Sequence, residues 1–202
     1  MKIVAIDATK RSGAVSRSMS TAADAAEACG ATVERIRLYD LDVRYCTGCL
    51  LCGPTGVCQM QDDLPDLATR ITDADAVIFG TTGYFRKADD ATRAILDRLS
   101  GYFAGNGQMR LPGMSASEIP QARDARAVKR AVIITACSAP EPLATFFGYT
   151  TGPVRELRRA LGSGGIRTIG SLAIPDTWRH PEMQSWEHDR AESLGRILAG
   201  KI

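Results

Sequence analysis

Five short apolar runs, each followed sooner or later by a helical pattern, constrain this chain more than any other feature of its sequence. The runs are Lys2–Asp7, Thr32–Leu38, Ala74–Phe79, Arg130–Thr135 and Ile166–Ile174. The helical patterns cover about 17–28, 62–72, 89–102, 152–161 and 181–199. Parallel strands need long crossover connections, which are usually helices that cover both faces of the sheet. The pattern therefore predicts an α/β fold, with residues 1–202 forming a single domain around one doubly wound, five-stranded parallel sheet.

The composition is ordinary for a globular protein, with 45% hydrophobic and 24% charged residues. A formal net charge of +2 gives no electrostatic reason to expect binding to nucleic acid or to a membrane surface. No run is long enough to span a membrane, and the N-terminus lacks the apolar core of a signal peptide. The six cysteines are therefore expected to be reduced, in a cytoplasmic protein. The presence of only two histidines, His180 and His188, argues against a histidine-based catalytic site.

Between the second and third runs, residues 44–62 form a cysteine-rich loop. Its thiols follow the spacing C-x2-C-x2-C-x5-C, and they are Cys46, Cys49, Cys52 and Cys58. Two-residue gaps let neighbouring thiolates turn toward one centre, which favours an iron–sulfur cluster. Structural zinc usually uses two separated C-x2-C pairs, and this chain has no second pair, but zinc stays an alternative. Four reduced thiols without any metal are the third interpretation.

Ligands of a doubly wound sheet bind at the carboxyl ends of its strands. At the first of these ends, the turn combines three hydroxyls, two cations and a glycine: Thr9, Lys10, Arg11, Ser12, Gly13 and Ser16. Together with the N-terminus of the following helix, these groups suit a phosphate monoester. The turn has neither the Gly-Lys-Ser/Thr of a P-loop nor a G-x-G-x-x-G motif. The alternative interpretation is a polar turn that Ser16 caps.

The third run leads into a turn with two hydroxyl residues, a glycine and two aromatics: Thr81, Thr82, Gly83, Tyr84 and Phe85. Its backbone amides can meet the edge of a planar ring while one of the two aromatics stacks beside it. Cys137 and Ser138, which follow the fourth run, would approach the same ligand. The alternative is that both turns serve only the packing of the strand ends.

Three further features carry predictions of their own. Residues 105–126, rich in Gly, Pro, Ser and Gln, predict a flap. Asp97 and Arg98 are interpreted as a pair on a helix surface. Trp178 and Trp186 are interpreted as packing anchors for the last helix.

Taken together, these motifs resemble the iron–sulfur flavoprotein branch of the flavodoxin-like NAD(P)H-dependent FMN reductase superfamily. The resemblance rests on the cysteine spacing followed by Asp62–Asp63, on Val77–Gly80 with the turn after it, and on Asp97–Arg98. It covers the first half of the chain, and beyond Gly105 only the order of strands and helices matches. In this family the first turn commonly reads Ser-Pro-Arg, where this chain has Thr-Lys-Arg.

The resemblance implies FMN, with its phosphate on the turn Thr9–Ser16 and its ring against Thr81–Phe85 and the Cys137–Ser138 loop. It also implies a [4Fe–4S] cluster on the four cysteines, and a dimer or tetramer in which the partner helps to cover the flavin. The chemistry belongs to the flavin, so no catalytic residue of the protein is predicted. NAD(P)H or a ferredoxin-type protein would donate electrons, and a quinone, a nitroaromatic compound or free flavin would accept them.

Three functions follow, in this order of preference. The first is an electron-transfer flavoprotein whose cluster exchanges electrons with FMN. The second is a cluster-free NAD(P)H-dependent FMN or quinone reductase. The third, from another class, is an interaction module that zinc stabilises and that has no redox activity.

Overall fold

The computed structural model describes residues 1–52, 58–103 and 129–200. Five parallel strands form the main sheet, and they are β1 (Lys2–Asp7), β2 (Thr32–Arg37), β3 (Ala76–Tyr84), β5 (Lys129–Ala136) and β6 (Ile166–Ile174). Their order is β2-β1-β3-β5-β6, the flavodoxin-like order of a doubly wound sheet. A two-residue strand, β4 (Lys87–Ala88), pairs antiparallel with the end of β3. The predicted fold class is confirmed, whereas the predicted flap, 105–126, lies outside the described residues.

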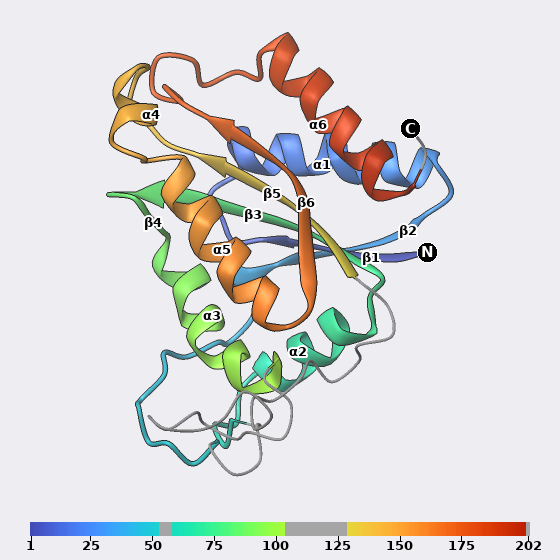
Figure 1. Ribbon diagram of the computed structural model, residues 1–202, viewed down its shortest axis with the longest axis vertical. Helices are drawn as coiled ribbons and strands as arrows, with labels where there is room; N and C mark the ends of the chain where they lie inside the picture. Colours follow the sequence, from blue (N-terminus) through green and yellow to red (C-terminus); the bar gives the residue numbers. More distant parts are fainter. Residues whose placement is uncertain (53–57, 104–128, 201–202) are drawn as a thin grey trace, which may run out of the picture.

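Helices cover both faces of this sheet (Figure 1). One face carries α1 (Ala14–Ala28) and α6 (Ser185–Leu198), and the other carries α2 (Leu64–Asp73), α3 (Asp90–Phe103) and α5 (Thr151–Ser163). Two short elements, the 3-10 helix η1 (Leu38–Asp40) and the helix α4 (Leu143–Phe146), follow β2 and β5. Among the helices of the described residues, none is both long and apolar enough to cross a membrane.

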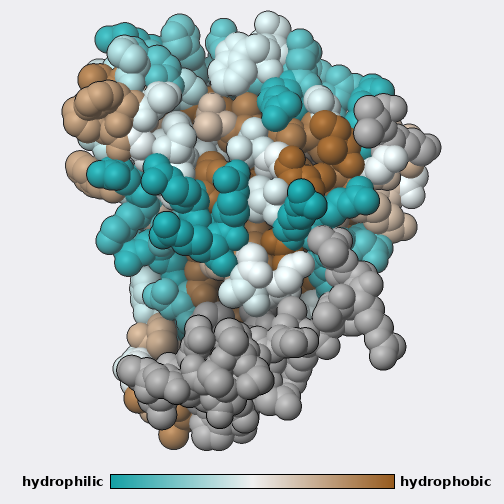
Figure 2. Space-filling model, viewed as in Figure 1, coloured by the Kyte–Doolittle hydropathy of each residue, from teal (hydrophilic) through white to brown (hydrophobic). Residues whose placement is uncertain are grey.

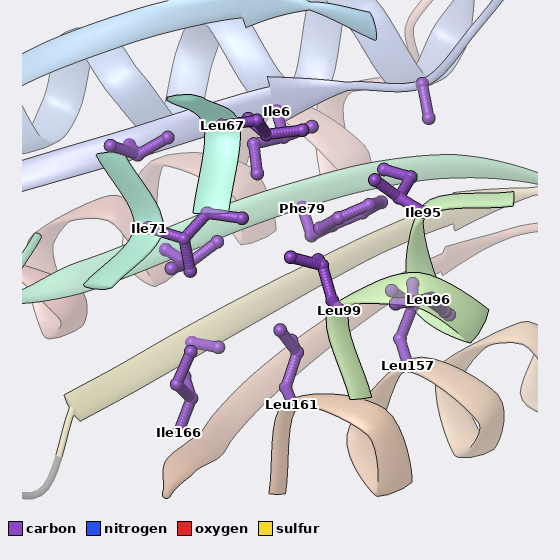
Figure 3. Packing of buried hydrophobic residues seen from close by; sticks show 14 of the residues in the cluster. Ile6, Leu67, Ile71, Phe79, Ile95, Leu96, Leu99, Leu157, Leu161 and Ile166 are labelled. Carbon is purple, nitrogen blue, oxygen red and sulfur yellow. The ribbon is translucent and has the colours of Figure 1, made fainter. Parts of the chain in front are cut away.

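The central strand β3 is buried on both faces because its side chains alternate between two apolar cores. Val77 and Phe79 belong to the core under α2, α3 and α5, and Ile78 belongs to the core under α1 and α6. Figure 3 shows Phe79 between Ile6 of β1 and Leu99 of α3. A strand covered on both faces requires a near-continuous apolar run. The apolar run of β3 therefore predicts a position inside the sheet.

Three element boundaries differ from the sequence prediction. β3 continues through Gly80 to Tyr84, because its last residues pair with β5 and with β4. Small and hydroxyl residues hide this extension from an apolar pattern. α1 begins at Ala14, three residues before the prediction, so Ser16 lies inside its first turn. α6 begins at Ser185, where Gln184 and Glu187 form a capping box.

The close packing of α6 on α1 predicts opposite effects for two glycine substitutions. A Cβ atom at Gly195 of α6 would overlap the backbone oxygen of Ala22 in α1. Gly195→Ala is therefore expected to lower the free energy of unfolding by about 1–3 kcal/mol. At Gly162 of α5 nothing lies within 4 Å of the added atom, so Gly162→Ala is expected to raise it by about 0.4–1 kcal/mol. Urea unfolding measures both, and equal effects would contradict the packing.

Candidate functional site

The strand ends from which the sequence predicts a site meet at one edge of the sheet. Asp7, the last residue of β1, lies opposite Gly80 of β3, and Thr82 lies opposite Ala136 of β5. The turn after β1, the extended end of β3 and the loop 137–138 therefore adjoin one another. This edge is where a doubly wound sheet binds its ligands.

The first turn is held by hydrogen bonds among its own side chains. Asp7 accepts the backbone N–H of Thr9 at 2.9 Å and its hydroxyl at 2.6 Å, both on Oδ1. The Thr9 hydroxyl also lies 2.8 Å from that of Ser16, and Thr9 is buried. Thr9 is therefore a support for the turn, because both of its donors are already used.

The groups left for a ligand at this turn are donors and cations. Lys10, Arg11 and Ser12 are exposed. α1 starts after Gly13, and in the described part of the chain no side chain caps this start and no acidic residue stands in its first turn. Its first backbone N–H groups have no intrahelical acceptor and carry a partial positive charge, which favours an anion. The turn therefore fits a phosphate group such as that of FMN.

The end of β3 is fixed by Asp89, a residue that the sequence analysis missed. Its Oδ2 accepts the Thr81 hydroxyl at 3.1 Å and the Thr82 amide at 3.4 Å, and its Oδ1 accepts the Thr92 amide at 2.7 Å. Asp89 is only 6% exposed, so its carboxylate needs all of these donors. Its position directly before α3, where acidic N-cap residues are common, could have indicated a structural role. The Thr81 hydroxyl and the Thr82 amide are thus bound within the protein.

The loop after β5 packs directly against the end of β3. A Cβ atom at Gly83 would overlap the backbone oxygen of Tyr149, and one at Gly152 would overlap the backbone of Arg86. Only glycine permits this approach at either position. Cys137 is buried, and its pKa is raised by that burial. The structure therefore brings Gly83 and Cys137 to the same edge of the sheet, and burial disfavours the thiolate form of Cys137.

Aromatic side chains stand exposed around this edge. Tyr84 is 62% and Phe85 86% exposed at the end of β3, Phe146 of α4 is 82% exposed, and Trp178 after β6 is 83% exposed. Figure 2 shows hydrophobic side chains gathered at the corner that α4 occupies in Figure 1. The interpretation of Trp178 as a packing anchor is wrong, because its ring is almost wholly in solvent. These rings are free to stack on a planar ligand or to meet another protein surface.

The 3-10 helix η1 connects this edge to the cysteine-rich loop. Burial raises the pKa of Tyr39 in η1, and the nearby Asp89, Tyr45, Tyr84 and Asp90 raise it further. Each of these four residues therefore lies within electrostatic reach of Tyr39. Since Tyr45 directly precedes the first cysteine of the motif and Tyr84 ends β3, Tyr39 lies near both the start of the loop and the end of β3.

The four cysteines of the motif do not form a ready-made metal site. Cys46 and Cys49 are exposed, and Cys52 and Cys58 are partly buried. Within residues 1–52, 58–103 and 129–200, no three His, Cys, Asp or Glu side chains gather closely enough to hold a metal ion. The donor set still fits, because four thiols on one short loop are the ligands of an iron–sulfur cluster or of zinc. A metal would have to draw the loop together as it binds.

Arg98 of α3 holds both ends of this loop. It forms an ion pair with Asp62, and the side chains of the pair are 1% and 0% exposed. The guanidinium also donates to the carbonyl oxygen of Arg44 at 2.9 Å and to the sulfur of Cys58 at 3.4 Å. The interpretation of Arg98 as part of a helix-surface pair is therefore wrong. Residues 59–62 carry no apolar pattern that could have announced this contact.

The charges at this contact are stabilised from several sides. Burial alone would raise the pKa of Asp62, but hydrogen bonds from Arg98 and from the backbone amides of Arg44 and Leu64 outweigh it and lower the pKa. A second effect lies in the loop itself, where hydrogen bonds from the Leu51 backbone and then the Thr47 side chain lower the pKa of Cys49. A lowered pKa favours the thiolate, which is the metal-binding form.

Comparison with known proteins points to one family. The model of a family described as NADPH-dependent FMN reductase matches residues 1–134. An iron-sulfur flavoprotein of Archaeoglobus fulgidus is 30% identical over 103 residues, which cover 50% of this chain and 47% of that protein. The chain thus spans about half the length of the curated relatives it matches. The resemblance stated from the motifs is confirmed by these matches.

Solved structures extend the likeness of fold to the whole chain. A flavone reductase superimposes with a TM-score of 0.70 at 21% identity, covering 99% of this chain and 62% of that one. A flavodoxin from the domain Archaea superimposes with a TM-score of 0.57 at 10% identity, covering 99% and 97%. At such low identity these likenesses establish the flavodoxin-like fold and nothing finer.

The buried Asp62–Arg98 pair predicts a specific dependence of stability on pH. Because the pKa of Asp62 is lower in the folded chain, its contribution is complete above the unfolded pKa of about 4 and is lost as the pH falls through the folded value. Asp62→Asn leaves Arg98 buried without a counter-charge and is expected to cost about 3–5 kcal/mol at pH 7. Asp66→Asn, which breaks a pair exposed by 63% on the Asp66 side, is expected to cost at most about 1 kcal/mol. Urea unfolding at pH 7 and pH 3 tests this, and a D62N loss as large at pH 3 as at pH 7 would contradict it.

Proposed function

The chain belongs to the NADPH-dependent FMN reductase family, and we propose that it is an FMN-dependent oxidoreductase that takes electrons from NAD(P)H or from a ferredoxin-type protein. The observation that carries the proposal is the set of three features at one edge of the sheet. An uncapped helix start follows β1, a fixed strand end with exposed aromatics closes β3, and the cysteine-rich loop follows η1 at the carboxyl end of β2. The matched residues, 1–134, include all three.

The residues of the turn Thr9–Ser16 have complementary parts in this proposal. The hydroxyl of Ser12, the backbone amides of α1 and the cations Lys10 and Arg11 bind the phosphate, and the Ser16 hydroxyl turns from Thr9 to join them. Thr9 and Gly13 keep the turn in shape. Binding the phosphate at a helix start needs no further charge, since two cations and oriented amides balance a dianion.

The ring would lie along the end of β3. Gly83 offers backbone to its edge while Thr82 keeps its hydrogen bonds to Asp89, Tyr84 or Phe85 stacks on its face, and Ser138 approaches from the loop after β5. When bound, FMN accepts a hydride or single electrons on its own ring, so the protein needs no acid or base of its own. Asp89 contributes by keeping the Thr81–Thr82 backbone in one position.

We propose that Cys46, Cys49, Cys52 and Cys58 hold a [4Fe–4S] cluster, which supplies one-electron transfer. Three observations support it: the cysteine spacing, the name of the curated relatives, and the position of the loop after η1 at the carboxyl end of β2. A cluster there would be the entry point for a protein donor, and the flavin would pass electrons to a quinone, a nitroaromatic compound or free flavin.

The exposed aromatics suit a second copy of the chain, as a dimer or a tetramer, which would shield the flavin from water. Four large rings at one edge are costly to leave in solvent. A cytoplasmic location, where thiols stay reduced, stays a prediction that fits this chemistry.

A second candidate is a cluster-free reductase in which NAD(P)H reduces FMN directly. The observation that favours it is the absence of a gathered group of three metal ligands among the described residues. A zinc-stabilised module without redox activity is the remaining alternative for the same four thiols.

The proposed phosphate site predicts a ligand-dependent effect of one hydroxyl. Ser16→Ala is expected to weaken FMN binding by about ten-fold, because it removes a hydrogen bond to a charged group. Binding of riboflavin, which has no phosphate, is expected to stay the same. Ser20→Ala is the matched control, since that hydroxyl lies one turn further along α1 and donates to the Ser16 carbonyl oxygen at 3.1 Å. Flavin fluorescence titration measures all four affinities, and equal weakening for both flavins would contradict the site.

The cluster proposal predicts the metal content of the protein purified without oxygen. About four iron and four sulfide per chain are expected, with loss of both in Cys52→Ser and retention in Cys29→Ser, which changes a thiol at the end of α1. Metal and sulfide assays with an absorption spectrum measure this. A spectrum of flavin alone that NADPH bleaches would favour the cluster-free reductase. Zinc without flavin would favour the interaction module.

A further inference from the structure

Arg98 forms a hydrogen bond with one of the four thiols of the motif. Its Nε donates to the sulfur of Cys58 at 3.4 Å, and Cys58 packs against the core under α2, α3 and α5. Cys46 and Cys49, in contrast, are exposed. One ligand of the proposed centre is therefore already in place before any metal binds.

The same guanidinium fixes the position from which the remaining thiols must approach. Its Nη1 donates to the carbonyl oxygen of Arg44, two residues before the first cysteine, at 2.9 Å. Its Nη2 donates to Oδ1 of Asp62 at 2.9 Å, and Asp62 accepts the Arg44 amide at 3.0 Å. The entry and exit of the loop are thus joined to α3 through one planar group, which offers its donors in a fixed fork.

We propose that Arg98 is a positioning residue for the metal centre: it holds Cys58 as the first ligand and keeps a hydrogen bond to that sulfur when the cluster is bound. This inference rests on the proposed cluster. A hydrogen bond and a positive charge at a ligand sulfur stabilise the reduced, more negative cluster, so Arg98 raises the reduction potential. Arginine stays protonated at every pH at which the protein is folded, so the effect does not depend on pH.

A purely structural role for the Asp62–Arg98 pair makes a different prediction. A buried ion pair that only closes a loop changes stability when it is altered, but it leaves the potential of a cluster in the folded protein unchanged. The potential therefore separates the two roles.

The experiment compares Arg98→Lys with Arg93→Lys in full-length, FMN-loaded protein purified without oxygen. Lysine keeps the positive charge but lacks the planar guanidinium, so it cannot donate hydrogen bonds to Cys58, Asp62 and Arg44 at the same time. Arg93 lies on the same helix and pairs with Glu156 at 3.6 Å, away from the cysteines. An EPR-monitored redox titration gives the cluster potential, and iron release to a chelator gives its retention. R98K is expected to have a more negative potential and to lose iron about ten-fold faster or more, whereas R93K is expected to match the parent.

A second pair of measurements keeps the inference testable if R98K is unstable. The double variant Asp62→Asn with Arg98→Gln removes both charges together, so that neither is left buried alone. It is expected to fold. Like R98K, it is expected to have a more negative cluster potential and to release iron faster. The Arg44 amide donates to Asp62, which Arg98 holds in place. Hydrogen exchange at this amide is therefore expected to quicken in R98K and in the double variant, with or without iron.

The outcomes separate this inference from the proposed function. A parent protein with a cluster whose potential and retention R98K and the double variant leave unchanged would overturn the inference alone. Unchanged hydrogen exchange at the Arg44 amide in both variants would overturn the inference in the same way. A parent that holds no iron and sulfide would overturn the proposed function and this inference together.

Discussion

The parallel pairing of β3 between β1 and β5 is the constraint on which the other features of this structure depend. Because β3 is central, its first half must be apolar on both faces, and Val77, Ile78 and Phe79 meet that demand. Its second half leaves the core at the carboxyl edge, where Thr81 and Thr82 replace apolar residues. One strand thus anchors the two cores and carries the backbone that we propose meets the flavin ring, so this part of the site inherits the rigidity of the sheet.

Two buried carboxylates convert this rigid sheet into fixed loops. Asp89 lies at the start of α3 and accepts donors from the end of β3. Asp62 lies at the start of α2, accepts the Leu64 amide at 3.2 Å and pairs with Arg98. Each carboxylate gains from the positive end of a helix and from donors in another segment. A buried charge needs hydrogen-bond or ionic partners. Supplying those partners holds the neighbouring loop in one arrangement.

The sequence predicted the fold and the location of the polar turn after β1 because both follow from local patterns. Apolar runs mark the buried strands, and a polar turn between a strand and a helix marks the ligand edge. The roles of Asp89 and Arg98 could not be predicted in this way. The contact of Arg98 with Asp62 spans 36 residues, that of Asp89 with Thr81 joins a helix start to a strand end eight residues earlier, and neither partner lies on a periodic pattern. The extension of β3 was missed for a related reason, since pairing with β4 and β5 decides it and not the residues themselves.

The two halves of the site differ in what holds them together. The flavin half is built from sheet and helix termini, whose hydrogen bonds exist without a ligand. The cysteine half is a glycine-containing loop with exposed thiols at Cys46 and Cys49, and its two ends and Cys58 are tied to the fold. Closing such a loop costs conformational entropy that four sulfur–metal bonds can offset. Metal binding would therefore order the loop, which follows η1 at the carboxyl end of β2, the same edge of the sheet at which the flavin would lie.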